Sequence, residues 1–343
     1  MEERHPGTQS RRRGIGGDWP RRGRGNGREL LGHGAQNAAL ERPNNGPGFS
    51  CVRSQAVFHG ACGPVQIPFG ERAVNPDAEA LRRVVSLLEI AYRHYFDVSV
   101  SGLETLPAAG PALLVGNHSG AINSPDMLML FVAWYRHMGF ETPLHALAHD
   151  AFFKIPGLGA ALREIGATPA NPEAAGEILR RGNFLLVYPG GDKDAFKPFG
   201  ARNRVNFHGR RGFLKLAVRA AAPVIPVCAR GGHETLFIIT SGRGLARRLG
   251  LGELFRFKQI PLAFSLPWGL TPGPFMPYIP FPIHIRLRFG EPLAFHERPG
   301  ADPENPAFIE KCHEELAAVM QRMIDEQSER RKIRMVRDST ARI

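Results

Sequence analysis

The chain has few cysteines and no long apolar run, and these absences exclude several kinds of protein. A membrane-spanning helix is not expected, because no window of about eighteen uninterrupted apolar residues is present. The Gly- and Arg-rich start lacks the apolar core of a signal peptide. The cysteines form no Cys-x-x-Cys pair and no zinc knuckle, so a reducing compartment is favoured. They are Cys51, Cys62, Cys228 and Cys312.

The charge is strongly basic and is concentrated near the two ends. The formal net charge is +12 over 343 residues. A basic surplus of this kind predicts an anionic partner, either nucleic acid or an acidic membrane surface. Solvated tails without a partner are the alternative. The residues concerned are Arg11, Arg12, Arg13, Arg21, Arg22, Arg24 and Arg28 in the first part, and Arg330, Arg331, Lys332, Arg334, Arg337 and Arg342 in the last.

Composition divides the chain into three predicted parts. Residues 1–72 are rich in Gly, Arg, Asn and Pro without a periodic apolar pattern, which predicts a disordered extension. Residues 73–327 carry the apolar patterns of a folded domain, and residues 328–343 form a basic tail. Because 43% of all residues are hydrophobic, the middle part can bury a sizeable core.

Within the folded part, strand patterns alternate with helical patterns. Such alternation predicts an α/β fold, with a mostly parallel, mixed central sheet flanked by helices in a single domain. The predicted strands are 96–100, 112–115, 144–148, 184–188, 224–227 and 283–289. The predicted helices have apolar faces over 81–90, 125–138, 158–165, 174–181, 213–221 and 306–327.

The most informative stretch, residues 113–126, places chemistry at the end of a buried strand. An apolar run delivers the pair Asn117-His118 into a loop of small residues. A Ser-Pro-Asp helix-start signal then ends at Asp126, and a carboxylate is favoured in the first turn of a helix. We therefore expect His118 to face a carboxylate that the helix N-terminus keeps ionised, as a general base requires. A hydrogen-bonded structural histidine is the alternative.

Two later segments repeat this logic. The strand predicted over 184–188 ends in a Pro-Gly-Gly turn, where backbone N–H groups can approach a phosphate or an oxyanion closely. A helix is then predicted from residue 213, just after Arg210 and Gly212, and a helix N-terminus with Arg groups suits a phosphate ester. A solvated basic loop is the alternative. The basic residues between the turn and this helix are Lys193, Lys197, Arg202, Arg204, Arg210 and Arg211.

Four motifs occur in a characteristic order along the folded part. They are Val-Gly-Asn-His-Ser-Gly with a later Pro-Asp (115–126), Val-Tyr-Pro-Gly-Gly (187–191), Gly-Arg-Arg-Gly-Phe-Leu-Lys-Leu-Ala (209–217) and Pro-Val-Ile-Pro-Val (223–227). Each is weakly specific alone, but the ordered set is fairly specific. With these motifs in this order, the chain resembles the glycerolipid (lysophospholipid) acyltransferase superfamily over residues 80–320. The resemblance is strongest to the branch of monoacylglycerol-acyltransferase-like enzymes, and it implies an acyltransferase-like catalytic domain.

The resemblance implies roles for individual residues. In that family the motif histidine is the general base that deprotonates the acceptor hydroxyl, and an aspartate orients it. These roles fall here to His118 and Asp126. The residues with an implied substrate-binding role are Asn117, Ser119, Gly120, Pro189, Gly190, Gly191, Arg210 and Gly212.

The chain departs from the family's pattern in three places. The usual His-x4-Asp spacing would put the acid at position 123, which is Asn123, and Asp126 follows three residues later. Gly190 replaces the Glu of the usual Pro-Glu-Gly turn, and the arginine of the second block is absent near 166–169. Acceptor binding is therefore expected to differ.

A second histidine satisfies the family's spacing literally. His145 is followed by Asp150 at the His-x4-Asp distance. However, no Asn precedes it, and it lies in a predicted strand. The context therefore favours His118 as the base and gives His145 no chemical role.

Together the motifs predict transfer of a fatty acyl group from a thioester, acyl-CoA or acyl carrier protein, to a hydroxyl of a glycerolipid or lysophospholipid. Apart from the thioester co-substrate, no cofactor and no metal are expected. One alternative is a lipid-acting hydrolase, which the absence of Gly-x-Ser-x-Gly disfavours. The other is a nucleic-acid-binding protein using its Arg-rich ends. The core carries no recognisable nucleic-acid module, so no specific nucleic acid is expected as a partner.

An uncharged segment, residues 262–281, predicts contact with a membrane surface. It is apolar and aromatic, and its prolines exclude a helix that could cross a bilayer. Its Trp and Tyr residues favour the water–lipid boundary. We expect monotopic binding in which this segment and the helix after Asp126 face lipid; packing on the protein's own core is the alternative. The protein would then be cytoplasmic and peripherally associated with the inner face of the membrane. Nearby basic residues expected to hold anionic head groups are Arg247, Arg248 and Arg256.

Overall fold

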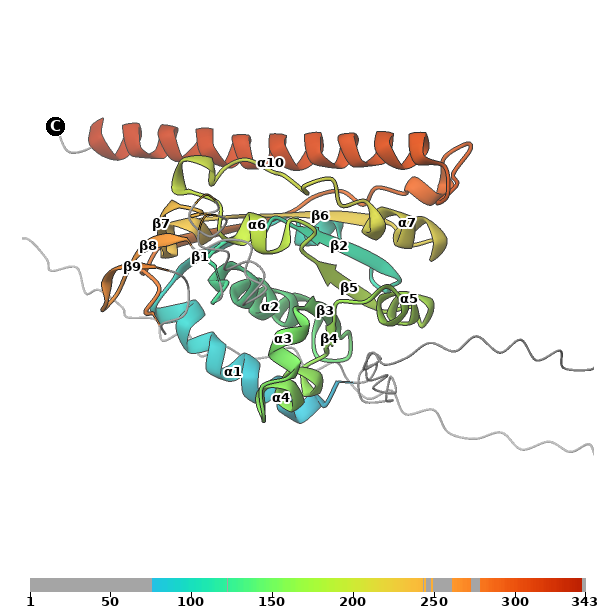
Figure 1. Ribbon diagram of the computed structural model, residues 1–343, viewed down its shortest axis with the longest axis horizontal. Coiled ribbons are helices and arrows are strands. Elements are labelled where there is room, and N and C mark those ends of the chain that lie inside the picture. The colour runs from blue at the N-terminus through green and yellow to red at the C-terminus, as the bar shows by residue number, and fades with distance from the viewer. Residues whose placement is uncertain are drawn as a thin grey trace, which may run out of the picture. The chain divides into compact units, whose positions relative to one another are not determined.

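The computed structural model describes residues 76–121, 123–242, 244, 248, 261–272 and 278–340, so the predicted disordered extension, residues 1–72, lies outside the described residues. Two sheets and the helices around them make up this part (Figure 1). The strands are β1 (Asp97–Ser101), β2 (Ala112–Gly116), β3 (Leu144–Ala148), β4 (Ala167–Pro169), β5 (Phe184–Val187), β6 (Val224–Arg230), β7 (Phe237–Thr240), β8 (Leu262–Ser265), β9 (Gly269–Pro272) and β10 (His284–Phe289). The helices are α1 (Ala78–His94), α2 (Pro125–Met138), α3 (Asp150–Phe153), α4 (Leu158–Glu164), α5 (Pro172–Arg180), α6 (Gly191–Ala195), α7 (Gly212–Arg219) and α10 (Pro306–Thr340), with short 3-10 turns η2 (Leu103–Thr105), η3 (Phe199–Ala201), η4 (Gly232–Thr235) and η5 (Phe295–Glu297).

The central sheet has seven strands in the order β1-β10-β6-β2-β5-β3-β4. Neighbouring strands are parallel except β10 and β6, which pair antiparallel. The predicted mostly parallel, mixed sheet flanked by helices is therefore confirmed. Strand β2 lies between β5 and β6 and is parallel to both, with Leu113 opposite Leu185 on one side and Val224 on the other. The carboxyl ends of these three strands thus meet at one edge, where ligands of open α/β sheets bind.

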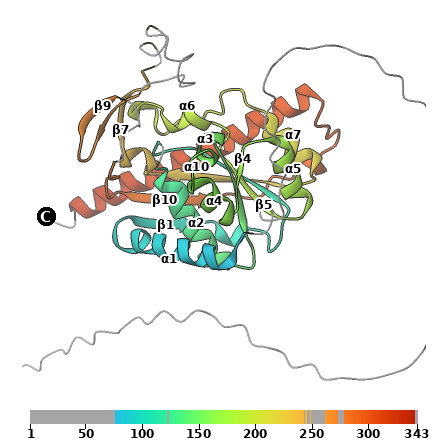
Figure 2. The ribbon, with the colours of Figure 1, turned by 60° about the horizontal axis from the view of Figure 1, so that its bottom comes forward.

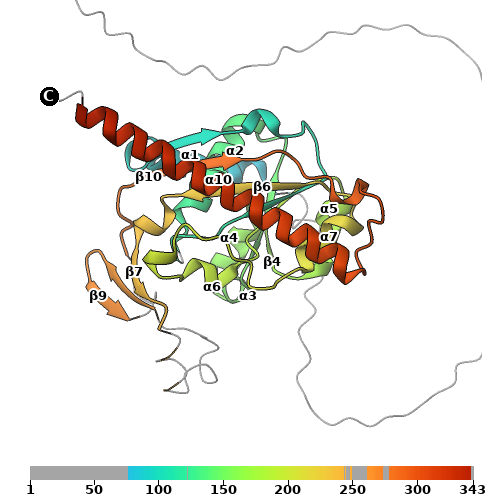
Figure 3. The same cartoon turned by 90° about the horizontal axis from the view of Figure 1, so that it is seen from above.

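Side chains that alternate along β2 contribute to two hydrophobic cores. Leu113 and Val115 pack on one face of the sheet with residues of α5, α7 and α10. Ala112 and Leu114 pack on the other face with α1 and α2. Figure 1 shows α10 on one side of the sheet and α1 and α2 on the other, and Figure 3 shows α10 running across it. Both faces are covered, which explains why the central strands are continuously apolar.

Two helices differ from the predictions. The lipid contact expected of α2 is replaced by burial: Trp134 is fully buried, and Phe131 packs against the same core. An all-round apolar helix suits either environment, so its sequence does not distinguish them. Helix α10 continues to Thr340, beyond the end predicted near Gln327, because residues 328–340 contain no Gly or Pro. Among the described residues, no helix is both long and apolar enough to span a bilayer.

A second, antiparallel sheet contains strands β7, β8 and β9 in that order. Most of this sheet lies in the proline-rich segment 262–281, for which no strand was predicted. The prolines do not prevent strand formation because Pro267 lies in the turn between β8 and β9, and Pro272 lies at the end of the edge strand β9. Figure 2 shows β7 and β9 beside the central sheet, and Figure 3 shows the same arrangement from above.

Candidate active site

The loops that follow β2, β5 and β6 meet at the carboxyl edge of the central sheet. The loop after β2 carries His118, and the loop after β5 is the Pro-Gly-Gly turn. The loop after β6 leads into η4 (Gly232–Thr235). Since these strands are adjacent and parallel, the structure brings together two of the predicted motifs and a third segment that was given no role.

Asn117 fixes the first loop to strand β6. Its Nδ2 donates a hydrogen bond to the Ala229 carbonyl, and its Oδ1 accepts one from the Ala229 N–H, both at 2.8 Å. The side chain is buried and both of its polar groups are engaged inside the protein. Asn117 therefore holds the next residue, His118, at the end of the strand. A contact between Asn117 and substrate stays a prediction.

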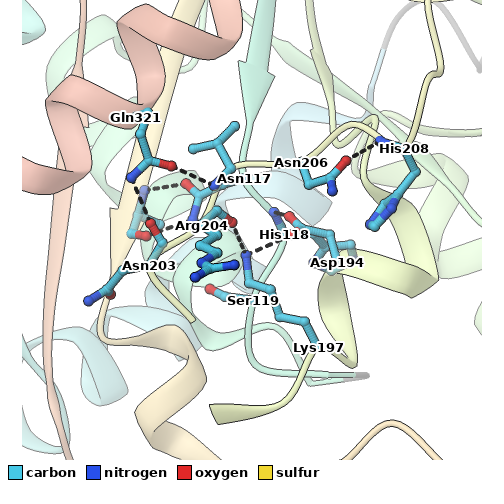
Figure 4. Close-up of polar contacts among 12 residues, drawn as sticks. Asn117, His118, Ser119, Asp194, Lys197, Asn203, Arg204, Asn206, His208 and Gln321 are labelled. Carbon is cyan, nitrogen blue, oxygen red and sulfur yellow. Dashed lines mark hydrogen bonds and ion pairs between the residues drawn. The ribbon is translucent and has the colours of Figure 1, made fainter. Parts of the chain in front are cut away.

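The main chain of His118 is held by a buried ion pair that the sequence analysis did not assign. The His118 N–H donates to Asp194 Oδ2 at 2.7 Å, and Asp194 Oδ1 lies 2.7 Å from Lys197 Nζ. Lys197 Nζ also donates to the Arg204 carbonyl at 2.8 Å, and Figure 4 shows it between Asp194 and Arg204. Asp194 is 2% exposed and Lys197 is 7% exposed, so water screens neither charge. This pair joins the loop after β5 to the loop after β2.

Glycines allow these loops to approach one another closely. A Cβ atom on Gly190 would lie 2.3 Å from the Cβ of Asp194. A Cβ atom on Gly232 would lie 2.1 Å from Ser119 Oγ. Gly120 has a φ of +73°, a left-handed conformation that favours glycine. A side chain at Gly190 would displace Asp194, one at Gly232 would push apart the loops after β2 and β6, and one at Gly120 would strain the backbone.

The environment of His118 favours a neutral imidazole. Burial lowers the pKa of His118 below its ordinary 6.5, and the nearby Asp194 carboxylate offsets only part of this effect. The ring lies 5.0 Å from the Tyr188 ring, measured between centroids. Its Nδ1 is buried and has no hydrogen-bond partner among the described residues. A neutral imidazole at neutral pH is able to accept a proton.

Asp126 lies in the first turn of α2, as expected, but its carboxylate binds Ser119. The Ser119 hydroxyl donates to Asp126 Oδ2 at 2.6 Å. Burial raises the pKa of Asp126 to about 7, while the hydrogen bonds from Ser119 and from the start of α2 lower it only in part. The expectation that the helix N-terminus keeps this carboxylate fully ionised is therefore wrong, because desolvation outweighs those hydrogen bonds. A hydrogen bond between Asp126 and His118 stays a prediction.

The Ser-Pro-Asp segment starts helix α2 without a side-chain cap. Pro125 is the first residue of α2 and Ser124 precedes it, as predicted. However, the Ser124 hydroxyl does not cap the helix; it donates to the Ala121 carbonyl at 2.8 Å. The side chain instead stabilises the tight turn that returns the chain from the loop to the helix.

Arg210 clamps the Pro-Gly-Gly turn. Its Nη1 donates to the Pro189 carbonyl at 2.8 Å, and its Nη2 lies 3.3 Å from Asp192 Oδ1. The guanidinium packs so closely on the turn that a Cβ atom on Gly191 would lie 2.1 Å from Nη1. Gly212 opens α7 and is exposed. Substrate binding by Arg210, Gly212 and the turn stays a prediction.

Tyr278 fastens the reactive loop from the side of the small sheet. Its hydroxyl donates to the Gly120 carbonyl at 2.7 Å, and Asn123 Nδ2 donates to the Tyr278 carbonyl at 3.1 Å. The position where the family usually carries its aspartate is thus occupied by an asparagine that binds the backbone. No local sequence signal identifies this contact, because 158 positions separate Tyr278 from Gly120.

Two further buried histidines occupy different places. His233 lies in η4, and burial lowers its pKa well below 6.5, with Lys197 and His118 adding to the effect. His145 lies on β3; burial lowers its pKa to about 4, and the Gly166 backbone is the other group acting on it. His233 is thus a neighbour of the site, whereas no charged group of the site acts on His145. Within the part of the chain that the structure describes, no group of three or more His, Cys, Asp or Glu side chains could hold a metal ion.

A family model matches the part of the chain that contains this site. Residues 97–230 match the family model described as acyltransferase. This part of the chain is therefore similar to acyltransferase domains. The match runs from the first residue of β1 to the last residue of β6, so it contains His118, Asp126 and the buried Asp194–Lys197 pair.

Individual relatives extend the comparison beyond the matched domain. The chain is 33% identical over 238 residues to an uncharacterized protein of Mycobacterium tuberculosis, which covers 69% of this chain and 63% of the relative. It is 31% identical over 227 residues to a human "DGAT1/2-independent enzyme synthesizing storage lipids", covering 66% of this chain and 60% of the relative. The chain therefore spans less than two thirds of either relative. The crystal structure of the 1-acyl-sn-glycerophosphate (LPA) acyltransferase PlsC from Thermotoga maritima aligns with a TM-score of 0.46 and 18% identity, covering 72% of this chain and 79% of that one.

Replacing Lys197 with Met tests the buried ion pair. The apolar side chain leaves the Asp194 charge buried and unpaired, so we expect the free energy of unfolding to fall by about 3–5 kcal/mol. The double variant with Asp194→Asn removes the charge and should recover much of this loss. Urea unfolding of the wild type, both single variants and the double variant measures the coupling. A loss below about 1 kcal/mol for Lys197→Met, typical of an exposed pair, would contradict this description.

The raised pKa of Asp126 predicts a pH-dependent stability. The folded pKa of about 7 exceeds the ordinary 3.8, so the folded state binds the proton more tightly and loses stability as the pH rises between these values. Asp126→Asn removes this titration. The stability of the variant relative to wild type should therefore increase by about 2–3 kcal/mol from pH 5 to pH 8, measured by urea unfolding. A difference that does not change with pH would show that the carboxyl titrates normally.

Proposed function

We propose that the chain moves a fatty acyl group from an acyl thioester, carried by CoA or by acyl carrier protein, to a hydroxyl of a glycerolipid or lysophospholipid. The observation that carries the proposal is the placement of His118: a domain similar to acyltransferase domains holds its half-buried, neutral imidazole where three strand ends meet. The name of the human relative, an enzyme synthesizing storage lipids, supports a lipid acceptor.

In the proposed reaction, Nε2 of His118 takes the proton of the acceptor hydroxyl while the hydroxyl oxygen attacks the thioester carbonyl carbon. The carbonyl π electrons move to oxygen and form a tetrahedral oxyanion. Collapse of this intermediate re-forms the carbonyl and breaks the C–S bond, and the departing thiolate takes the proton back from the imidazolium. The base is thereby regenerated without an acyl-enzyme. Backbone N–H groups of 119–120 or 190–191 are the candidates for stabilising the oxyanion.

We assign Asp126 the role of balancing the imidazolium charge. Its Oδ1 and the Nδ1 of His118 are both buried and lack hydrogen-bond partners among the described residues. These are the two atoms that the proposed His–Asp hydrogen bond would join. With a pKa of about 7, the ionised fraction of Asp126 increases through neutral pH, so the proposed role requires acyl transfer to become faster over this range.

The site geometry argues against the hydrolase alternative. Ser119 is 1% exposed, and its hydroxyl donates to the Asp126 carboxylate. A hydroxyl buried in this way cannot reach a substrate carbonyl as a nucleophile. The nucleic-acid alternative depends on Arg-rich ends whose side chains lie outside the described residues. Deletion of residues 1–50 separates the two functions, because it would abolish nucleic-acid binding and leave acyl transfer intact.

His118→Ala tests the proposed function directly. Loss of the general base should lower turnover by about 10²–10⁴-fold while circular dichroism shows a folded protein. The assay offers several acyl-CoAs with a panel of lyso-lipids, diacylglycerol and alcohols and detects products by mass spectrometry. His145→Ala is the matched control, since it removes a buried histidine from β3, which β5 separates from β2, and should preserve turnover per folded molecule. Near-wild-type turnover in His118→Ala, with loss in His145→Ala, would refute the assignment.

A further inference from the structure

The small sheet carries a concentration of exposed apolar side chains. Among the described residues, twelve large apolar side chains are exposed, and seven of them belong to β7, β8, β9 or the residues adjoining them. The exposed face of a half-buried antiparallel sheet normally carries polar side chains, so an apolar one indicates a partner. The seven, which we call the outer apolar patch, are Phe237, Ile239, Phe264, Leu266, Trp268, Leu270 and Ile279.

The strand register places the centre of the patch on one face of the sheet. Phe237, Phe264 and Leu270 stand directly opposite one another across the three strands. They are 41%, 44% and 58% exposed. The adjacent row points the opposite way: Ile238 and Ala263 are 1% and 3% exposed and belong to the core beneath the sheet. Exposure therefore alternates with the pleat, and the outward row is the apolar one.

The chemistry of the patch suits a lipid surface. Strands β7, β8 and β9 contain no charged residue. The segment that joins β7 to β8, residues 241–260, contains five Lys or Arg residues and one Glu, and both of its ends join this sheet. An apolar face on strands that a basic segment joins in the sequence complements a bilayer that presents hydrocarbon below anionic head groups. Trp268, which lies in the turn between β8 and β9, is of the residue type that prefers the water–lipid boundary.

We propose that the outer apolar patch docks onto the surface of an anionic lipid bilayer. The further statement that this bilayer supplies the lipid acceptor rests on the proposed function. The same region of the chain holds the reactive loop: Tyr278 binds the Gly120 carbonyl, and Gly120 follows His118 by two residues. Tyr278 also packs in the core beneath this sheet, so docking through the sheet would couple the reactive loop to the membrane-bound region.

A bilayer fits the patch better than a protein partner does. Protein interfaces carry about one hydrogen bond per 100–200 Å², which requires polar groups among the apolar ones. The central row of the patch offers only hydrocarbon and aromatic groups. Strand β8, at the centre of this sheet, is paired on both sides, so its side chains can contact lipid without exposing unpaired backbone groups of that strand.

Binding of the full chain to vesicles of phosphatidylcholine mixed with phosphatidylglycerol tests this proposal. Leu270→Glu places a charge in the patch at a position exposed enough for the fold to tolerate it. It should weaken vesicle affinity by about tenfold or more, because hydrocarbon contact is lost and a charge must be desolvated. Leu158→Glu is the matched control at another exposed leucine, on α4, and should leave affinity within about twofold. Both melting temperatures should match that of the wild type.

A second measurement does not depend on the folding of Leu270→Glu. In the wild type, brominated lipids should quench the fluorescence of Trp268, and Trp268→Phe should abolish this quenching. Absence of quenching with vesicle-bound protein would overturn the proposal. Equal affinities for Leu270→Glu and wild type would also overturn it, as would equal losses in both Glu variants. Dissociation of a dimer by Leu270→Glu without a change in vesicle affinity would identify the patch as a contact between copies and would equally overturn it.

The vesicle experiment separates the docking proposal from the proposed function. Vesicle binding requires no chemistry, so binding that depends on Leu270 supports docking even in a protein that transfers no acyl group. Conversely, acyl transfer to a detergent-dispersed acceptor without any vesicle binding would refute docking and support the proposed function.

Discussion

The buried pair of Asp194 and Lys197 joins the loops from which the candidate site is built. One carboxylate oxygen holds the N–H of His118, and the other holds a lysine that also binds the Arg204 carbonyl. Both charges are removed from water, so each stabilises the fold only in the presence of the other. Asn117 adds a second link, from the same loop to β6. The loop that carries the proposed base is therefore fixed to β6 on one side and to helix α6, which follows β5, on the other.

Burial shifts the pKa values of the two proposed catalytic groups in opposite directions, and in each group it favours the uncharged form. It lowers the pKa of His118, which favours a base without a proton, and it raises the pKa of Asp126 to about 7. The proposed reaction needs the first effect, because a protonated imidazole cannot accept the acceptor's proton. The second destabilises the folded protein whenever Asp126 is ionised. Retention of a destabilising carboxylate beside the reactive loop is consistent with a role in the reaction rather than in folding.

The local features of the site could be predicted from the sequence, whereas the contacts between distant segments could not. The end of β2, the start of α2 and the turn after β5 are set by short patterns, and these place His118 and Asp126 correctly along the chain. The partner of Asp194 is a backbone N–H that lies 76 positions away, and an N–H leaves no signature in the sequence. The Asp-x-x-Lys spacing of Asp194 and Lys197 is the one local signal that could have indicated an ion pair.

The small sheet shows a second limit of sequence patterns. Prolines in 262–281 indicate that regular secondary structure is interrupted. Strands tolerate proline in turns and on sheet edges, and only the pairing of the strands shows where each proline lies. The apolar character of the segment was nevertheless informative. Its alternate residues divide between a core that supports the reactive loop and the outward face that we propose binds lipid.

The central claim, that the fold keeps His118 as a neutral base, is tested most directly by the titration of its imidazole. NMR of the protein with isotope-labelled histidine gives this pKa, and the signal is assigned by its absence in His118→Ala. We expect a pKa below 6.5 that decreases further in Asp194→Asn, where the offsetting carboxylate is lost. A pKa at or above 6.5 in the wild type would contradict the central claim.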